Sequence, residues 1–562
     1  AAWATAMGAV DPGRVRVLGD HPPARGAQYV LLWVQQDVRA TCNHAFEKAV
    51  QEANELDLPL LACYGLCEKF PDANERAFRF LLEGLRDAAE GFAARGVRLV
   101  CRRAAPPDVA CGLAQAAACV VVDRGYARIC RAWREQFVKR MPGVRLTQVE
   151  TNVVLPVELA SRGREPAAAT LRPKLQRLLP RFLTPVREAP LRRRAPDLAL
   201  PADVEAGLVD LSDPLALLAL LEIDKGVPPA VGFTGGSRHA ETRLQAFLPR
   251  LRSYGTGKAN NPSVQDNSFL SPYLHFGHIS PVELSLRIWA AGQGAQEGGG
   301  AAAPAFTVPS AAGAVASGAA AFLEELIVRR ELARNFCNFC EEYDKFGCLP
   351  GWAQATLMQH MDDKRTHHYS FEQLQRGETH DPCWNAAQWE MVATGHMHNY
   401  MRMYWCKQLI TWVQDPRVAF EWAVRLNNKF SLDGRDENGY MGIAWCFGHH
   451  DRPFPDRPIF GTVRPMTRSG LESKFDMARY QRLVQRKCRD AASADARVLR
   501  LVPSAALGGA GGGALLRFLA PPSAAAAPGA LADVPAKSQP APAAGVGKPP
   551  AERSRSPPAG CG

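Results

Sequence analysis

The sequence lacks three signals that would assign it to a common class of protein. Its apolar runs all fall short of the roughly 18 residues that a membrane-spanning helix needs, so no membrane segment is expected. Gln35–Thr41 follows the first strand-like run without the G-x-G-x-x-G motif of dinucleotide-binding folds. Cys337 and Cys340 have no second Cys or His pair at zinc spacing, which favours buried structural thiols and no metal.

What is present indicates a large protein with an acidic partner. The 562 residues exceed one ordinary core, so two or more domains are expected. The net charge of +11 favours nucleic acid as the partner, and a basic surface without a partner is the alternative. The 15 cysteines, several of them inside apolar runs, are typical of thiols in a reducing intracellular compartment. We expect the protein to be located in the nucleus, the chloroplast or both.

Short apolar runs alternate with helical patterns between Tyr29 and Glu150. Continuous apolar runs are typical of buried parallel strands, and the alternation predicts a doubly wound α/β domain. From Phe233 to Val484 apolar residues recur at helical spacing, which predicts an all-helical second domain. The expected strands are Tyr29–Trp33, Leu58–Tyr64, Val97–Cys101, Cys119–Asp123 and Arg145–Val149, and the expected helices between them are Asn43–Leu56 and Glu75–Ala94.

Composition then sets the expected domain boundaries. Residues 150–230 are rich in Pro and Arg, residues 291–321 in Gly and Ala, and residues after Pro503 in Ala, Pro and Gly. We expect a tail over 1–28, an α/β domain over 29–160, a linker over 161–230, a helical domain over 231–485 with a flexible insertion over 291–321, and a disordered tail over 486–562.

Three tryptophans stand out in the helical half. Trp405 and Trp412 are seven residues apart, which places them on one helix face about 10.5 Å apart along the axis, and Trp384 comes from the preceding element. Core packing is one interpretation, and a chain of oxidisable rings is the other. Arg402 lies three residues before Trp405, and Asp433 follows Trp412 in the sequence. A buried Arg–Asp pair is more readily explained by a cofactor than by stability.

A loop rich in hydroxyl and amide side chains precedes these elements. It runs from Tyr254 to Pro281 and includes Ser268 and Ser271, which with nearby backbone N–H groups form a candidate cradle for a diphosphate. Such residues also serve as helix caps and turns. The loop alone therefore leaves both interpretations open.

Several long motifs in this region resemble one known family. They are S-F-L-S-P-Y-L-H-F-G, F-L-E-E-L-I-V-R-R-E-L-A-R-N-F-C, G-E-T-H-D-P-C-W-N-A-A-Q, M-R-M-Y-W and L-D-G-R-D-E-N-G-Y-M-G-I-A-W. Together they resemble the class II cyclobutane pyrimidine dimer photolyases over roughly Tyr29 to Tyr480. The chain departs from the family pattern at His396 and Asn399, where the family usually has Lys and Gly.

The resemblance implies a helical domain that holds FAD, and it assigns roles to matching positions. The implied cofactor contacts are Tyr254, Asn267, Ser268, Phe269, Leu270, Ser271, Arg402, Asn427, Asp433 and Arg435. Trp405, Trp384 and Trp412 would carry electrons to the flavin, Glu325 would hydrogen-bond the dimer, and Asn385, Met403 and Trp445 would contact the flipped lesion or its DNA.

The implied activity is light-dependent DNA repair, in which photoexcited reduced FAD gives one electron to the pyrimidine dimer. A second, antenna chromophore of unidentified chemistry belongs to the same resemblance, and we expect a monomer that binds damaged DNA. A cryptochrome-like blue-light photoreceptor is the alternative, for which the long C-terminal tail argues. A flavoprotein that only binds DNA or a protein partner is a third hypothesis.

Overall fold

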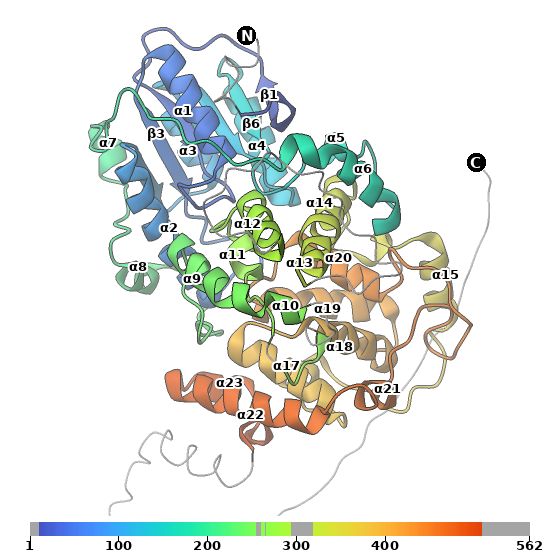
Figure 1. Ribbon diagram of the computed structural model, residues 1–562. Coiled ribbons are helices and arrows are strands. Elements are labelled where there is room, and N and C mark those ends of the chain that lie inside the picture. Colours follow the sequence, from blue (N-terminus) through green and yellow to red (C-terminus); the bar gives the residue numbers. More distant parts are fainter. Residues whose placement is uncertain (1–9, 255–259, 265, 294–317, 509–562) are drawn as a thin grey trace, which may run out of the picture. The chain divides into compact units, whose positions relative to one another are not determined.

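A computed structural model describes residues 10–254, 260–264, 266–293 and 318–508. All of them belong to one compact unit, Ala1–Leu516. Within this unit the strands and the first helices form an α/β part, and the helices from α9 onward form a helical part (Figure 1). The predicted fold class is thus confirmed.

The α/β part is built on a six-stranded sheet in the order β1-β6-β5-β2-β3-β4. The strands are β1 Val15–Gly19, β2 Tyr29–Trp33, β3 Leu60–Gly65, β4 Arg98–Arg102, β5 Ala117–Asp123 and β6 Leu146–Val149. Strands β2 to β6 pair in parallel, and their apolar runs are buried as predicted. β1 pairs antiparallel with β6.

The prediction of a tail over residues 1–28 is wrong for β1. Its V-R-V-L-G sequence is only partly buried, because it forms the edge of the sheet and has a neighbour on one side. A half-exposed run of five residues with an Arg gives no continuous apolar signal. Residues 1–9 lie outside the described part of the chain.

Four helices cover the two faces of this sheet: α1 His44–Leu56, α2 Glu75–Ala94, α3 Pro106–Ala114 and α4 Arg128–Arg140. Alternate residues of β2 point to opposite sides, so Val30 and Leu32 pack with α1 and α2, whereas Leu31 and Trp33 pack with α3 and α4. Asn43 begins α1 by accepting the N–H of Phe46 at 3.1 Å.

The carboxyl ends of β2 and β5 meet where the strand order reverses, the usual place for a ligand in such sheets. Here the Asp123 carboxylate accepts the backbone N–H groups of Gln35 at 2.6 Å, Gln36 at 2.7 Å and Asp37 at 3.1 Å. The chain's own carboxylate therefore occupies donors that a phosphate would need. This contact gives a physical reason for the missing Gly-rich motif.

The segment predicted as a linker over 161–230 contains packed structure. It is preceded by α5 Val157–Ala160 and holds α6 Ala168–Phe182, α7 Ala202–Glu205 and α8 Pro214–Leu220. Leu171, Leu175 and Leu179 of α6 are buried in the core of the helical part. The sequence of this segment is visibly basic and amphipathic, but its Pro and Arg residues favoured a linker, whereas its apolar i, i+4, i+8 face packs as a helix.

The helical part begins with α9 and carries the candidate site. Its helices are α9 Ser237–Phe247, α10 Leu251–Tyr254, α11 Ser271–His275, α12 Pro281–Gln293, α13 Gly318–Leu323, the π-helical segment Glu324–Arg329, α14 Arg330–Phe339, α15 Gly351–Gln359, α16 Phe371–Arg376, α17 Pro382–Thr394, α18 Asn399–Trp412, α19 Pro416–Phe430, α20 Glu437–Cys446, α21 Arg468–Glu472, α22 Met477–Ala494 and α23 Val498–Leu501.

The predicted start of the C-terminal tail at residue 486 is wrong. α22 continues to Ala494 and buries Cys488 and Ala491, and its Lys487 ammonium lies 2.7 Å from Oε1 of the buried Glu390 on α17. The sequence here is basic, and its apolar residues are small, so the helical stripe is weak. Residues 509–562 and most of the predicted insertion, 294–317, lie outside the described residues.

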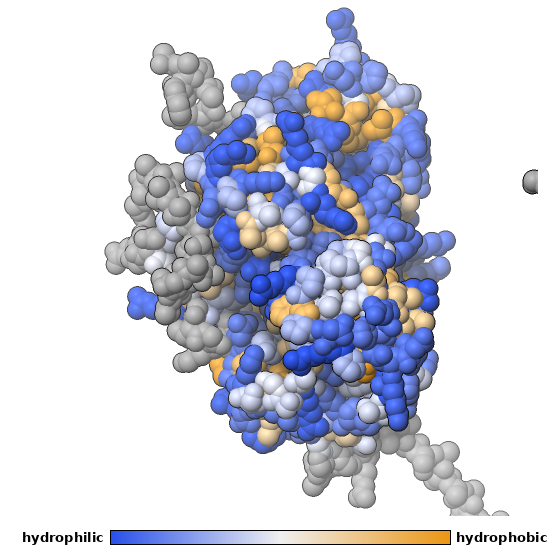
Figure 2. Space-filling model, turned by 90° about the vertical axis from the view of Figure 1, so that its right-hand side faces the viewer, coloured by the Kyte–Doolittle hydropathy of each residue, from blue (hydrophilic) through white to orange (hydrophobic). Residues whose placement is uncertain are grey.

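The hydropathy of the surface does not by itself indicate a binding site. The face in Figure 2 is mainly hydrophilic, with hydrophobic side chains in separate patches, as on most protein surfaces. Within the described ranges, no helix is both long and apolar enough to cross a membrane. The same ranges contain no group of three or more His, Cys, Asp or Glu side chains placed to hold a metal ion.

Candidate active site

The three predicted tryptophans form a contiguous ladder. Trp405 and Trp412 lie on α18, and Trp384 of α17 lies against both: its ring is stacked 6.2 Å from Trp405 at 9° and edge-on 5.3 Å from Trp412. α17 begins at this point because Asp381 caps it, accepting the N–H groups of Cys383 and Trp384. All three rings are almost fully buried.

Hydrogen bonds fix the orientation of two of these rings. The Trp384 Nε1–H donates to the Trp405 carbonyl at 2.9 Å, and the Trp405 Nε1–H donates to Oε1 of Gln388 at 2.9 Å. Satisfied indole groups and direct ring contact allow either core packing or electron transfer. The geometry is therefore compatible with both interpretations of the sequence.

The ladder continues to the surface through residues that sequence reasoning missed. The Tyr369 ring lies 5.3 Å from Trp412 and His380 lies 5.6 Å from it. The Tyr369 hydroxyl is 2.5 Å from Nδ1 of His380, and the exposed His367 stacks on His380 at 3.6 Å. These residues come from loops around α16, where no periodicity marks them, and only the H-H-Y triplet at 367–369 offered a signal.

Arg402, one turn before Trp405 on α18, forms the predicted pair with Asp433. Its Nη2 lies 2.7 Å from Oδ1 of Asp433, and the guanidinium also donates to Oδ1 of Asn427 at 3.1 Å and to the Ser431 hydroxyl at 3.0 Å. The two side chains are 24% and 16% exposed, so solvent reaches them, yet burial is the largest influence on the pKa of Asp433. We call the surroundings of Arg402, Asn427, Ser431 and Asp433 the polar recess.

Electrostatics keep this carboxylate charged. Burial tends to raise the pKa of Asp433, but the Arg402 guanidinium and a hydrogen bond from Ser271 outweigh burial and hold that pKa below its ordinary value. Asp433 is thus ionised at neutral pH and bound on two sides. Ser271, at the start of α11, joins the predicted loop to this cluster.

The predicted loop 267–271 reaches the cluster from another direction. Phe269 has a left-handed backbone (φ 56°), and its ring packs 4.9 Å from His396. Asn267 and Ser268 are half-buried, and Leu270 is in the core. Nδ1 of His396 is buried and has no hydrogen-bond partner among the described residues. A bound molecule with a polar group could supply that partner.

Glu325 lies in the π-helical segment between α13 and α14. π-Helical turns are rare and occur often at functional sites, and the helical spacing of the sequence did not predict one. The side chain reaches solvent, yet burial is the largest cause of its raised pKa, which places it in a recess and not on a convex surface. Tyr254, predicted to contact the cofactor, donates its hydroxyl to the Glu325 carboxylate.

The residues predicted to receive the lesion have different surroundings. Met403 is 37% exposed, and the Trp445 ring is half-buried under the Arg329 guanidinium at 5.2 Å. Asn385 instead fastens a loop: its Oδ1 accepts the N–H and hydroxyl of Thr379, at 3.0 and 2.7 Å, and its Nδ2 donates to the Thr379 carbonyl. A DNA contact for Asn385 stays a prediction.

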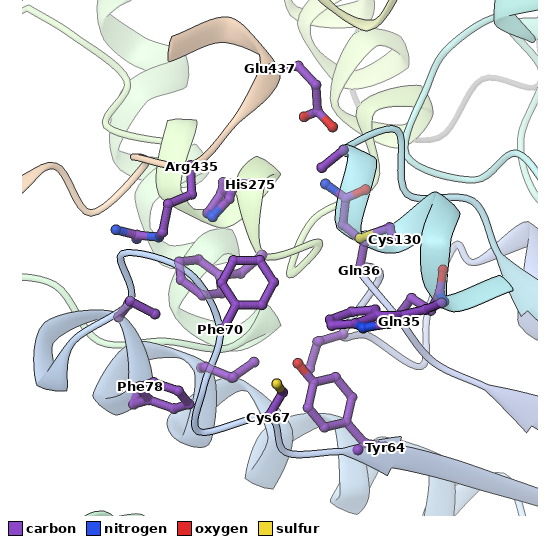
Figure 3. A pocket seen from close by; sticks show the side chains of 18 residues that line it. Gln35, Gln36, Tyr64, Cys67, Phe70, Phe78, Cys130, His275, Arg435 and Glu437 are labelled. Carbon is purple, nitrogen blue, oxygen red and sulfur yellow. The ribbon is translucent and has the colours of Figure 1, made fainter. Parts of the chain in front are cut away.

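A separate cavity lies between the α/β and helical parts, at the carboxyl ends of the strands (Figure 3). It encloses about 830 Å³, including its opening to solvent. Arg435, predicted as a flavin contact, lies in the wall of this cavity beside His275, and its guanidinium donates to the Asn428 carbonyl. The further lining includes Gln35, Gln36, Tyr64, Cys67, Phe70, Phe78, Cys130, Trp133, Phe276 and Glu437.

Comparison with known proteins places this site in context. The sequence model of the family "DNA photolyase" matches residues 30–192. The deoxyribodipyrimidine photo-lyase of Methanothermobacter thermautotrophicus is 42% identical over 468 residues, 83% of this chain and 97% of that protein. The enzyme of the same name from Arabidopsis thaliana is 34% identical, over 84% of this chain and 92% of that protein.

Solved structures show the same fold at lower identity. An archaeal photolyase from Sulfolobus tokodaii, solved with two FAD molecules, superposes with a TM-score of 0.57 at 16% identity and covers 80% of this chain and 89% of its own. A Synechocystis cryptochrome gives a TM-score of 0.57 at 15% identity, over 84% and 88% of the two chains. Because the curated relatives match at 34–42% identity over most of their length, this chain belongs to the DNA photolyase family.

Proposed function

We propose that this protein is a deoxyribodipyrimidine photo-lyase, a monomeric enzyme that uses blue light to split cyclobutane pyrimidine dimers in DNA. The observation that carries the proposal is a single helix, α18, which holds Arg402 of the polar recess one turn from Trp405 of the ladder. The names of the curated relatives support the same activity. The motifs of the sequence favour class II.

The recess fits FAD. A flavin ring edge alternates hydrogen-bond donors and acceptors, and the recess offers a guanidinium, a carboxylate, the Asn427 amide and the unpartnered Nδ1 of His396. Arg402 and Asp433 would hold the ring, and Ser268 and the loop backbone would hold the phosphates, since the Ser271 hydroxyl is bound to Asp433. When bound, FAD supplies the light-excited electron donor.

The ladder would resupply electrons from the surface. Trp405, Trp384 and Trp412 pass them inward by ring contact, and Tyr369 is the outermost ring that can be oxidised. Tyr369 must release its hydroxyl proton when it loses an electron. Burial lowers the pKa of His380, so its ring is neutral and Nδ1, at 2.5 Å, is free to take that proton.

The lesion side of the recess would receive an extruded dimer. A dimer stacks poorly, so flipping it out of the duplex costs less than flipping an intact pair. Trp445 and Met403 offer apolar surface to the dimer, and Glu325 offers a hydrogen bond. The net charge of +11 supplies affinity for phosphates without reading sequence.

The interdomain cavity would hold the second chromophore. Its walls combine aromatic rings, among them Tyr64, Phe70 and Trp133, with polar groups at the ends, including Arg435 and Glu437. A planar conjugated molecule with a charged edge matches that lining. The contact of Arg435 with FAD stays a prediction, and its place in this wall supports the second chromophore better.

The Tyr254–Glu325 hydrogen bond should affect how the repair yield depends on pH. The hydroxyl stabilises the ionised carboxyl and so lowers the pKa of Glu325, whereas burial raises it. Tyr254→Phe should therefore raise that pKa, so that the neutral carboxyl, which donates to the dimer, persists to higher pH. The pH profile of repair by chemically reduced enzyme should shift to higher pH.

Glu325→Gln is the matched control, since Gln donates a hydrogen bond and does not titrate. This variant should lose the fall in repair yield at high pH that ionisation of Glu325 causes, and it should keep part of the yield. A shift of the Tyr254→Phe profile to lower pH, or a fall at high pH that persists in Glu325→Gln, would contradict the hydrogen bond from Glu325 to the dimer.

The proposed activity has a direct assay. Chemically reduced holoenzyme should remove thymine dimers from DNA under blue light and leave them in the dark. A flavin-containing protein that leaves the dimers intact under light would favour the cryptochrome-like alternative, for which the Synechocystis structure shows only a shared fold, or, if it binds the DNA, the binding-only flavoprotein.

A further inference from the structure

One arginine links two residues that are predicted to contact the lesion. Arg329 ends the π-helical segment Glu324–Arg329, four residues after Glu325. Its guanidinium lies 5.2 Å from the centre of the Trp445 ring on α20. The side chain of Arg329 is 41% exposed, so DNA at the surface can reach it.

The partners of Arg329 in the free protein hold it weakly. Its Nε lies 3.4 Å from Oε1 of Glu324, which is longer than an ordinary N–H···O bond. The same carboxylate accepts two bonds from Arg172, at 2.7 Å from Nη2 and 3.2 Å from Nε. Two guanidinium groups thus share one carboxylate, and one positive charge is left over.

The Trp445 ring has a second neighbour that is firmly held. The His450 ring meets Trp445 edge-on at 5.6 Å. Nδ1 of His450 lies 2.8 Å from the Pro166 carbonyl, and because a carbonyl only accepts, this nitrogen is the donor. Contacts of an exposed arginine with a ring and with a shared carboxylate are weak. Arg329 can therefore change its partner while the Trp445 ring stays in place.

We propose, on the basis of the function proposed above, that Arg329 exchanges Glu324 for a phosphate of the damaged strand when the flipped dimer enters beside Trp445. A phosphate offers a guanidinium two oxygens at once, and such charge-assisted bonds are stronger than a long, shared ion pair. Glu325 acts on the dimer as a neutral carboxyl, so it does not compete for the charge of Arg329. Arg329 would favour damaged DNA, because the strand is drawn toward Trp445 only where a nucleotide is flipped out.

The test measures how salt weakens DNA binding by the holoprotein. A labelled duplex with one thymine dimer is titrated in the dark at salt concentrations between about 50 and 200 mM, and fluorescence anisotropy gives the affinity. Each phosphate contact adds about 0.9 to the slope of log affinity against log salt, so Arg329→Gln should lower that slope by about this amount. Loss of a charge-assisted contact should also weaken binding about tenfold.

Two variants serve as controls. Arg329→Lys keeps the charge and should keep the salt slope. Arg140→Gln changes an arginine of α4 in the α/β part that is 47% exposed and pairs with Asp108 at 2.6 Å, and it should leave both affinity and slope unchanged. Arg329 is partly exposed, so Arg329→Gln should fold, and the FAD that it retains checks this.

An undamaged duplex of the same sequence shows whether the contact needs a flipped dimer. On this duplex Arg329→Gln should bind as the wild type does. A loss of affinity for damaged DNA with an unchanged slope would show that Arg329 contacts the bases, and an equal change of slope on both duplexes would show that it binds any DNA backbone. Either result would overturn the proposal, as would wild-type affinity and slope on damaged DNA.

Repair by chemically reduced holoenzyme under blue light separates this inference from the proposed function. Arg329→Gln should raise the KM for damaged DNA more than it lowers kcat, because the arginine holds the strand and takes no part in electron transfer. If the wild type repairs dimers and the variant keeps the wild-type KM and salt slope, only the role of Arg329 is contradicted. If the wild type fails to repair, the proposed function is contradicted, and the salt slope on damaged DNA still decides whether Arg329 contacts a phosphate.

Discussion

Trp405→Phe should reduce the rate at which light converts oxidised FAD to its reduced form to less than about one-tenth of the wild-type value. Phe is much harder to oxidise than Trp, and a barrier increase of only about 1.4 kcal/mol already gives a tenfold loss. Trp405 is the ladder member nearest Arg402 along α18, and it stacks on Trp384 at 6.2 Å. Photoreduction under blue light with an external thiol donor, followed by absorbance, measures the effect.

Two comparisons make this result specific. The chemically reduced variant should still repair dimers, because the ladder serves reduction and not the repair step. Trp389→Phe is the matched control: Trp389 also lies on α17, about 140° around the helix from Trp384, and donates its N–H to the Arg376 carbonyl at 3.0 Å. Equal losses in the two variants would refute the ladder, as would loss of repair in reduced Trp405→Phe.

Arg76→Met should lower the free energy of unfolding by about 3–5 kcal/mol. Arg76 extends from α2 and is 2% exposed. Its guanidinium donates to the carbonyls of Pro228 at 2.9 Å, Met391 at 3.1 Å, Val392 at 2.6 Å and Phe430 at 2.6 Å. Met would fill the space but leave the four carbonyls without the guanidinium, three of them at the ends of the helices that carry Trp384 and Asn427.

Urea denaturation of the holoprotein and of the variant measures this loss. Arg79→Met, one turn along α2, is the matched control, since Arg79 is 33% exposed and pairs with Glu83. Its loss should be clearly smaller, because Arg79 makes one such bond and Glu83 keeps the Gly235 N–H as a donor. Similar small losses in both variants would show that Arg76 does not hold the two parts of the protein together.

The sequence was most informative where local chemistry and burial agree. β2 occupies Tyr29–Trp33 and α2 occupies Glu75–Ala94, as predicted, because β2 is a fully buried apolar run and α2 buries one face at helical spacing. The Arg402–Asp433 pair was predictable because charges inside apolar surroundings need partners. By contrast, β1 at the sheet edge and α22 with its basic surface were misread as tails, because their burial comes from tertiary contacts.

The remaining site residues could not be predicted from the sequence, because they come together only in the folded structure. Tyr369 and His380 reach Trp412 from loops on either side of α16, and no spacing rule connects them. Tyr254 meets Glu325 across 71 positions of the sequence, and Glu325 lies in a π-helical turn that helical spacing does not predict. Arg435 belongs to the same L-D-G-R-D turn as Asp433, but its left-handed backbone (φ 62°) places the side chain in the interdomain cavity.

The absorption spectrum of the purified holoprotein shows most directly whether the helical part holds FAD. We expect a yellow protein that releases about one FAD per chain on denaturation, and an Asp433→Asn variant that retains much less of it, because the recess loses its fixed charge. A protein that stays colourless after reconstitution with FAD, or an Asp433→Asn variant that binds FAD as tightly as the wild type, would contradict it.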